Sequence, residues 1–312
     1  MPPVDVTHRQ TPGTTRRMPG ADRRAPGTSR PGRAGVRLLA PVLALAALCG
    51  FLLPAPAARA EEDPAARGLR GQAAGRFTGW AFETCVAPPL ETMRAWRASP
   101  YRAVGIYYAG RGRGCPRQPH LRRSWVREVH RMGWRLLPVF VGSQSPCVLA
   151  EHKRDKRMGR RPAVTGRHEA RQAVVRARAL GILRGSPLYL DVEAYRLSDT
   201  GCARATLTYV RAWNREVRRM GFVPGFYSSA ESGVRHMERA RRAGVGDLPE
   251  VMWFARWHTR PSLYGEPELH PGAWRPGRRI HQYAGNVAET HGGHRLLIDR
   301  NRMDAPVARV RP

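Results

Sequence analysis

Two carboxylates near the middle of this 312-residue chain have the type and spacing of a proton-transfer site. In the stretch PLYLDVEAY, residues 187–195, Asp191 and Glu193 follow an apolar run. Successive side chains of a β-strand point to opposite faces, so the two carboxylates share one face of a strand. A like-charged neighbour raises the proton affinity of one member of such a pair and can keep that acid protonated at neutral pH.

This pair has two interpretations. Paired carboxylates serve general acid and electrostatic roles in glycosyl transfer to water. Alternatively, the acids only end a buried strand and are paired with surrounding arginines.

The segments around the pair predict the element that positions it, a parallel barrel. Strand-like segments lie at residues 77–83, 103–109, 135–141, 187–193, 223–227, 251–257, 279–283 and 296–299. Helix-like segments lie at residues 89–98, 122–132, 167–180, 203–220 and 229–243. This alternation favours a single (β/α)8 TIM-like barrel of the α/β class at residues 76–305, with a tail at residues 306–312. The crossovers at residues 259–278 and 284–295 show no clear helix, so we expect the barrel to be irregular there.

Polar and aromatic side chains follow the ends of these strands, where the reactive groups of a (β/α) barrel lie. Acids supply protons and charge, and flat rings contact the apolar faces of sugars. The candidate substrate-binding residues are Glu83, Tyr108, Gln144, Tyr227, Trp257, Gln282 and Asp299. The basic segment EHKRDKRMGRR, residues 151–161, is expected to be a solvated surface loop, with a binding patch as the alternative.

The composition is strongly basic, with 54 basic and 24 acidic residues and a formal net charge of +30. Lys153 and Lys156 are the only lysines, and an arginine excess of this kind is typical of a biased genomic composition. A nucleic-acid surface is the alternative, but the sequence contains no nucleic-acid-binding motif. A positive field attracts anionic envelope polymers, which are therefore candidate partners beside a cell-wall polysaccharide.

The first 60 residues have the pattern of an export signal. Arginines precede an apolar segment at residues 38–53, and a small-x-small cleavage pattern follows at residues 58–60. We therefore expect cleavage after Ala60 and a polar leader at residues 61–75. The mature protein would be secreted or associated with the cell envelope, without a stable membrane span. A membrane anchor is the alternative, and Arg23-Arg24 is a weak indication of the twin-arginine route.

Four cysteines remain when Cys49, which lies inside the apolar segment, is set aside. An even number in an exported chain predicts two disulfides, with three possible connectivities. Free or metal-bound thiols are the alternative, but no pair has the C-x-x-C spacing of a zinc site. The sequence also lacks a Gly-rich phosphate loop, so we expect neither a metal nor a cofactor. The disulfide candidates are Cys85, Cys115, Cys147 and Cys202.

Eight short motifs together point to a known family. They are FETC at residues 82–85, SPYRAVGIY at 99–107, GWRLLP at 133–138, QSPC at 144–147, DVEAY at 191–195, YSS at 227–229, HQY at 281–283 and ID at 298–299. In these motifs the chain resembles the glycoside-hydrolase-like domain of secreted actinobacterial proteins, long classed as a domain of unknown function. The resemblance covers nearly all of residues 76–305. It implies a (β/α) barrel distantly similar to the family twenty-five glycoside hydrolases, the muramidases that cleave peptidoglycan glycan chains.

The resemblance also implies roles for individual residues. Glu193 aligns with the general acid, Asp191 with the carboxylate that supports the developing cation or the substrate acetamido group, and Asp299 with a cleft acid. The family usually carries Asp where this chain has Glu83. The additional methylene moves that carboxylate by about a bond length. A misplacement on the order of 1 Å can cost about a hundredfold in rate, so Glu83→Asp is the first reversal to test if hydrolysis is absent.

The leading hypothesis is thus a secreted glycosidase that acts on a cell-wall glycan with N-acetylated amino sugars. Glu193 would donate the proton and Asp191 would assist it. The alternatives are a catalytically inactive cell-wall glycan-binding protein, and an envelope protein held chiefly by its charge on anionic polymers.

Overall fold

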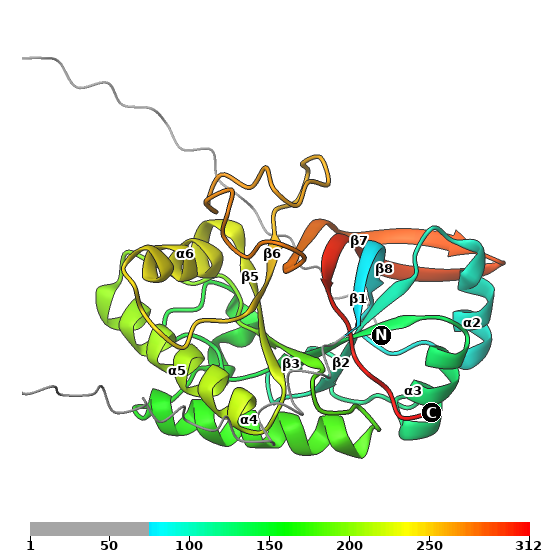
Figure 1. Cartoon of the computed structure of the whole chain (residues 1–312), viewed down its shortest axis with the longest axis horizontal. Helices are drawn as coiled ribbons and strands as arrows, with labels where there is room; N and C mark the ends of the chain where they lie inside the picture. Colours follow the sequence, from blue (N-terminus) through cyan, green and yellow to red (C-terminus); the bar gives the residue numbers. More distant parts are fainter. Residues whose placement is uncertain (1–74) are drawn as a thin grey trace, which may run out of the picture. The chain divides into compact units, whose positions relative to one another are not determined.

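The computed structural model describes residues 75–312, in which eight strands close into a barrel (Figure 1). The expected export signal and nearly all of the polar leader lie outside the described residues. The strands are β1 (Arg76–Glu83), β2 (Ala103–Ala109), β3 (Arg135–Val141), β4 (Pro187–Asp191), β5 (Val223–Ser229), β6 (Val251–Ala255), β7 (Arg279–His291) and β8 (His294–Pro306). The predicted TIM-like α/β barrel is confirmed.

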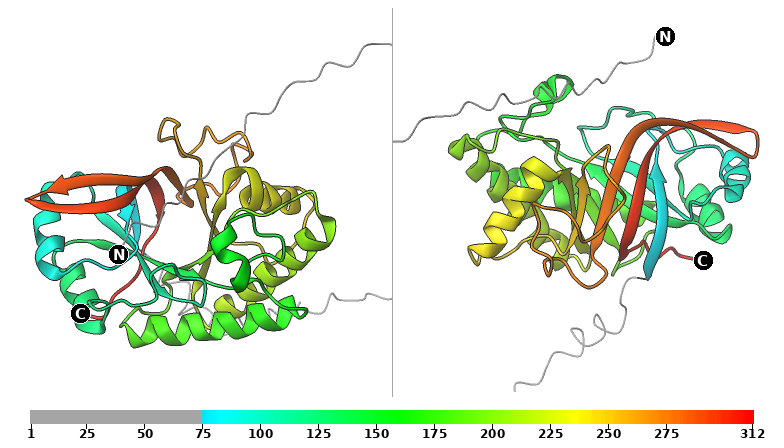
Figure 2. Two further views of the ribbon diagram at one scale, coloured as in Figure 1. Left: turned by 180° about the vertical axis from the view of Figure 1, so that it is seen from behind. Right: turned by 90° about the horizontal axis from the view of Figure 1, so that it is seen from above.

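Helices follow most of the first six strands and cover the outside of the barrel (Figure 2). They are α2 (Leu90–Ala95), η1 (Trp96–Ala98), α3 (Arg123–Arg131), η2 (Glu151–Lys156), α4 (Pro162–Ala179), α5 (Thr200–Arg219), η3 (Ala230–Val234) and α6 (Arg235–Arg242). Gly133, Gly181 and Gly221 follow α3, α4 and α5 with φ of 88°, 82° and 82°. Glycine adopts this left-handed conformation without steric cost, and so ends each helix just before the next strand.

The last strand runs opposite to the expected direction. Strands β1 to β7 are parallel to their sequence neighbours, whereas β8 is antiparallel to both β7 and β1. Only Gly292 and Gly293 join β7 to β8, and both have positive φ. A two-residue turn can join antiparallel strands only, so a hairpin replaces the last crossover of a (β/α)8 barrel.

Two hydrophobic clusters form the core. The one inside the barrel contains Leu137, Tyr189, Trp253 and Met303, whose large side chains fill the lumen. The other lies between the strands and the helices that cover them. The polar site is therefore confined to one end of a barrel whose interior is packed with side chains.

The chain after residue 305 packs against the barrel. The Ala308 backbone N–H donates to the Leu136 carbonyl at 2.9 Å, and Val310 forms a bridge with Ile182. This segment, expected as a tail, therefore joins the fold through backbone hydrogen bonds. Within residues 75–312, no helix is both long and apolar enough to cross a membrane.

Both expected disulfides are present. Cys85 is bonded to Cys115, and Cys147 to Cys202. The first joins the loop after β1 to the loop after β2, and the second joins the loop after β3 to the start of α5. Both therefore restrain loops at the barrel end where the acids lie.

Candidate active site

Four acids predicted from the sequence meet at one end of the barrel: Glu83, Asp191, Glu193 and Asp299. Glu83 of β1 is in register with Asp299 of the reversed β8, and Asp191 of β4 with Tyr227 of β5. Burial raises the pKa of the Tyr227 hydroxyl, and all four acids raise it further. These strand ends therefore create one strongly acidic region.

Glu83 is the deepest of the four acids. It is 1% exposed, and each carboxylate oxygen accepts a hydrogen bond from an amide, Oε1 from Gln282 Nε2 and Oε2 from Asn301 Nδ2. Burial raises the pKa of Glu83 and Asp299 adds to the rise, whereas the two amide donors oppose it. Glu83 thus anchors two amides below the mouth of the barrel.

Gln282 links this anchor to two aromatic residues. Its Oε1 accepts a hydrogen bond from the Tyr227 hydroxyl at 3.0 Å and another from Trp257 Nε1 at 2.8 Å. Gly285 lies directly against the Trp257 ring, where an added Cβ would come within 2.1 Å of Cζ2. The structure therefore brings together Tyr227, Trp257 and Gln282, three residues predicted separately from strand ends.

Asp191 and Glu193 lie in different environments. Asp191 is 4% exposed, and its Oδ1 has no hydrogen-bond partner among the described residues. Burial raises the pKa of Asp191 and Glu193 adds to the rise, whereas Lys153 lowers it. The Glu193 side chain is 24% exposed and reaches solvent. The pair therefore consists of a buried carboxyl that favours its protonated form and an accessible carboxyl.

Gln144 holds the backbone of this pair. It is fully buried, its Oε1 accepts the Glu193 backbone N–H at 2.8 Å, and its Nε2 donates to the carbonyls of Gly142 and Asp191, each at 3.2 Å. The polar atoms of this predicted substrate-binding residue are thus used within the protein. Its amide instead orients the strand end that carries both acids.

A cation that the sequence analysis assigned to solvent lies beside the pair. Lys153 in η2 is only 6% exposed, and its Nζ donates to the Gly112 carbonyl at 2.6 Å and lies 3.7 Å from Glu193 Oε1. The expected solvated loop is thus wrong at Lys153, although the Glu151 side chain in the same turn is 83% exposed. Among the described residues, the ion pair of Glu193 is with this lysine and not with an arginine.

Asp299 lies on β8 opposite Glu83. Its Oδ1 accepts the backbone N–H of Asn286 at 2.7 Å. Burial raises the pKa of Asp299 to about 6, the Asn286 hydrogen bond lowers it, and Glu193 raises it. Asp299 can therefore change its charge in mildly acidic conditions.

The two adjacent tyrosines of β2 point to opposite faces. Tyr108 is 6% exposed, and its hydroxyl donates to the Ala173 carbonyl of α4 at 3.1 Å, so its predicted place in the cleft is wrong. Tyr107 instead packs against the lumen cluster, and Glu83, Asp299 and Asp191 add to the rise that burial causes in its pKa. The residue that faces the acids is therefore one position earlier than expected.

Sequence reasoning missed Asn301 and Lys153, and of the adjacent pair Tyr107 and Tyr108 it chose Tyr108 for the site. The small residues Ala103 and Gly105 precede Tyr107 on the same face, and small side chains are what a crowded lumen admits, so the face of Tyr107 could have been found. Asn301 lies two residues after Asp299, the spacing at which side chains share one face of a strand. The expected strand ended at residue 299, so this signal was not used. Lys153 has no comparable local signal.

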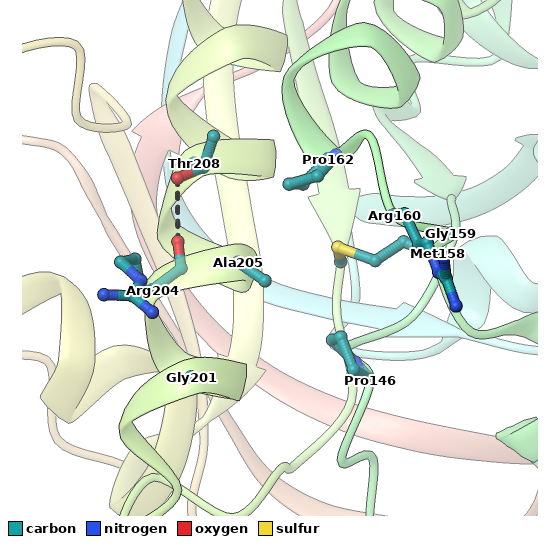
Figure 3. Close-up of a pocket in the computed structure, with 9 residues that line it drawn as sticks. All are labelled: Pro146, Met158, Gly159, Arg160, Pro162, Gly201, Arg204, Ala205 and Thr208. Carbon is teal, nitrogen blue, oxygen red and sulfur yellow. Dashed lines mark hydrogen bonds between the residues drawn. The ribbon is translucent and has the colours of Figure 1, made fainter.

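No group of three or more His, Cys, Asp or Glu within residues 75–312 could hold a metal ion. A surface groove of about 540 Å³ lies between the loop after β3 and the start of α5, with Pro146, Met158 and Arg204 in its lining (Figure 3). Its lining includes none of the four acids, so the groove is separate from the acidic mouth.

The comparison with protein families decides the affiliation of this chain. Residues 94–303 match the model of the Rv2525c-like, glycoside hydrolase-like domain. The chain belongs to this family. Asp191, Glu193, Gln282 and Asp299 lie within the matched residues, and Glu83 lies before them. The resemblance inferred from the sequence motifs is thereby confirmed.

Several solved structures are similar to this chain. The Mycobacterium tuberculosis Tat-secreted protein Rv2525c, in complex with L-tartrate, is 15% identical with a TM-score of 0.49, over 73% of this chain and 96% of that chain. The catalytic domain of endolysin ply40, from bacteriophage P40 of Listeria monocytogenes, is 13% identical with a TM-score of 0.44, over 73% and 93%. The Clostridium perfringens spore cortex lytic enzyme SleM is 13% identical with a TM-score of 0.46, over 72% and 67%. No curated protein matches the chain.

Proposed function

We propose that this protein is an exported glycosidase that acts on a cell-wall glycan containing N-acetylated amino sugars. The observation that carries the proposal is the pair Asp191 and Glu193. A buried carboxyl, one of whose oxygens has no hydrogen-bond partner within residues 75–312, lies two residues from an accessible one. Most glycoside hydrolases use two carboxyl groups whose environments give them different roles. Family membership and the lytic enzymes among the similar structures support the same substrate class.

The accessible Glu193 is the proposed proton donor to the leaving oxygen of the glycan. Asp191 would orient the acetamido group or stabilise the positive charge that develops on the sugar ring. Tyr227 and Trp257, held by Gln282, would contact the apolar faces of the sugar rings. Asp299 would provide a further acid within the cleft.

Digestion of purified glycans tests this proposal. The protein, with both disulfides formed, is incubated with peptidoglycan and with chitooligosaccharides, and new reducing ends are followed by mass spectrometry. We expect release by the wild type and none by Glu193→Gln, which keeps the shape of the side chain but cannot donate a carboxyl proton. Undiminished release by Glu193→Gln would exclude Glu193 as the proton donor.

One contact favours a second function, glycan binding without turnover. Lys153 Nζ lies 3.7 Å from Glu193 Oε1. A neighbouring cation favours the ionised form of a carboxyl, whereas a general acid must carry a proton. A binding protein would keep its affinity in the double variant Asp191→Asn/Glu193→Gln and release no product at any pH. Product from the wild type would exclude this function.

Secretion and retention at the cell envelope belong to the same proposal. The basic composition would hold the protein on anionic envelope polymers, and this attraction weakens as salt rises. If salt alone releases the protein from cell walls and a neutral glycan fragment does not compete, the protein is attached by its charge and not by its cleft.

A further inference from the structure

Lys153 is the most unusual charged residue near the acid pair. It is one of only two lysines in an arginine-rich chain, and it is 6% exposed. Exposed charges need no explanation, but a charged group is rarely buried without a partner. Its ammonium nitrogen donates one hydrogen bond, to the Gly112 carbonyl, and its nearest acid is Glu193 at 3.7 Å.

The turn that carries Lys153 is held by both neighbouring loops. Arg111, from the loop after β2, donates hydrogen bonds to the Lys156 carbonyl at 2.9 Å and to the Asp155 carbonyl at 3.1 Å. The backbone N–H of Gln144 donates to the same Lys156 carbonyl at 2.9 Å. Because Gln144 also holds the Glu193 backbone, the lysine and the acid share one scaffold.

Charged and titratable groups from seven segments surround the pair. Glu83 of β1, Tyr107 of β2 and Tyr209 of α5 are each affected by the charge of Asp191. Asp191 ends β4, Glu193 lies two residues further along the chain, and Lys153 comes from η2. Tyr227 of β5 and Asp299 of β8 are both affected by the charge of Glu193. Lys153 is the one cation whose contact with this pair is found among the described residues.

We propose that Lys153 is a positioning residue that controls how the acid pair shares a proton. Its ammonium lies next to the accessible Glu193 and balances one negative charge of the pair. The negative charge of the pair is therefore held on Glu193, and a shared proton is held on the buried Asp191. An opposite charge within about 4 to 6 Å of a carboxyl favours its charged form.

This inference rests on the proposed function only for its consequence for turnover. A glycosidase with Glu193 as its acid would need that group to gain a proton, so Lys153 would confine activity to mildly acidic pH. Without the ammonium, the pair keeps its proton to higher pH, and the active range extends upward.

Carboxyl titration by carbon-13 NMR tests the inference without any substrate. Protein with labelled Asp and Glu side chains is titrated, and Asp191→Asn and Glu193→Gln identify the two signals. The two groups are treated as one coupled pair with two titration steps. In Lys153→Met, which retains the length of the side chain, we expect the upper step to move to higher pH by about 1 to 2 pH units.

Lys156→Met is the matched control. Lys156 lies in the same turn, but its Nζ is paired with Asp155 at 2.5 Å. We expect this variant to titrate as the wild type does. Lys153→Gln keeps a donor for the Gly112 carbonyl and replaces Lys153→Met if circular dichroism shows that the Met variant is unfolded.

Two outcomes would overturn the inference: an unchanged titration in folded Lys153→Met or Lys153→Gln, or an equal change in Lys156→Met. The pH profile of reducing-end release gives the second measurement, in which Lys153→Met should extend activity to higher pH. Absence of release from every protein would contradict the proposed function, while the NMR titration would still decide the role of Lys153.

Discussion

Shortening Glu83 should break the network below the mouth of the barrel. Both oxygens of this side chain are used, one by Gln282 and the other by Asn301. Aspartate places its carboxylate about 1.5 Å further back, the length of one C–C bond. The backbone cannot follow, because Glu83 is in register with Gly105 on one side and Asp299 on the other. Its Cβ also packs against Gly105, within 2.7 Å of where a Cβ would stand there.

The expected cost follows from the buried groups that lose partners. A hydrogen bond contributes about 0.5 to 1.5 kcal/mol, and leaving a buried amide without its partner costs about 1 to 3 kcal/mol. With at least one bond lost, we expect Glu83→Asp to lower the free energy of unfolding by about 3 kcal/mol. At a typical dependence on urea of about 3 kcal/mol per M for a domain of this size, the unfolding midpoint falls by about 1 M.

Glu83→Gln is the control, because it keeps the length of the side chain but replaces one of the two acceptor oxygens by an NH2 group. Gln282 cannot turn its amide to compensate without losing Tyr227 and Trp257. A cost of about 1 to 2 kcal/mol is expected, below that of the shorter residue. Urea unfolding followed by tryptophan fluorescence measures both variants. If Glu83→Asp unfolds at the wild-type midpoint, or is more stable than Glu83→Gln, the network does not depend on the length of this side chain.

Three further predictions concern other parts of the site. Burial raises the pKa of Asp299 from 3.8 to about 6, so its proton stabilises the folded protein fully below pH 3.8 and this stability is lost as the pH rises through about 6. The free energy of unfolding of the wild type, measured with urea, should therefore fall by about 2 to 3 kcal/mol between pH 4 and 7 because of this group, and Asp299→Asn should lack that component. The same pH dependence in both proteins would contradict this. Gly285→Ala places a Cβ 2.1 Å from the Trp257 ring and should weaken glycan binding by about tenfold, or about 1.4 kcal/mol, in a binding titration. Gly246→Ala, whose Cβ meets nothing within 4 Å, is the control and should have no effect. Replacing Cys147 and Cys202 by Ser removes a disulfide between residues 55 positions apart and should lower the free energy of unfolding by about 2 to 4 kcal/mol. Equal urea midpoints of the variant and the wild type would refute this.

Features that depend on local pattern were predictable. The alternation of strands and helices indicated the barrel, and Gly133, Gly181 and Gly221 marked where helices end. The apolar run before Asp191 indicated the strand that ends at this residue, although β4 stops two residues before Glu193. Each of these inferences uses only the geometry of neighbouring residues, which the backbone periodicity determines.

The errors arose where a local pattern had two solutions. The segment between β7 and β8 was interpreted as a crossover without a helix, although Gly292-Gly293 is a signal for a two-residue hairpin turn. Reversal of β8 still left Asp299 beside Glu83, because the strand extends beyond the closed part of the barrel. For Tyr107 and Tyr108, an apolar strand offered two faces, and the narrow lumen selected the one with Ala103 and Gly105.

The sequence by itself determined the types of the acids, the strand ends near which they lie and the family of the barrel. Tertiary structure alone decided their protonation environment. Glu83 meets Gln282 and Asn301 across 199 and 218 residues, and Lys153 reaches Glu193 from a turn that composition assigned to solvent. Burial and Coulomb interactions depend on distances through space, which local periodicity does not specify. The chemistry of the mouth is therefore set by contacts between distant segments, whereas its ingredients are visible in the chain.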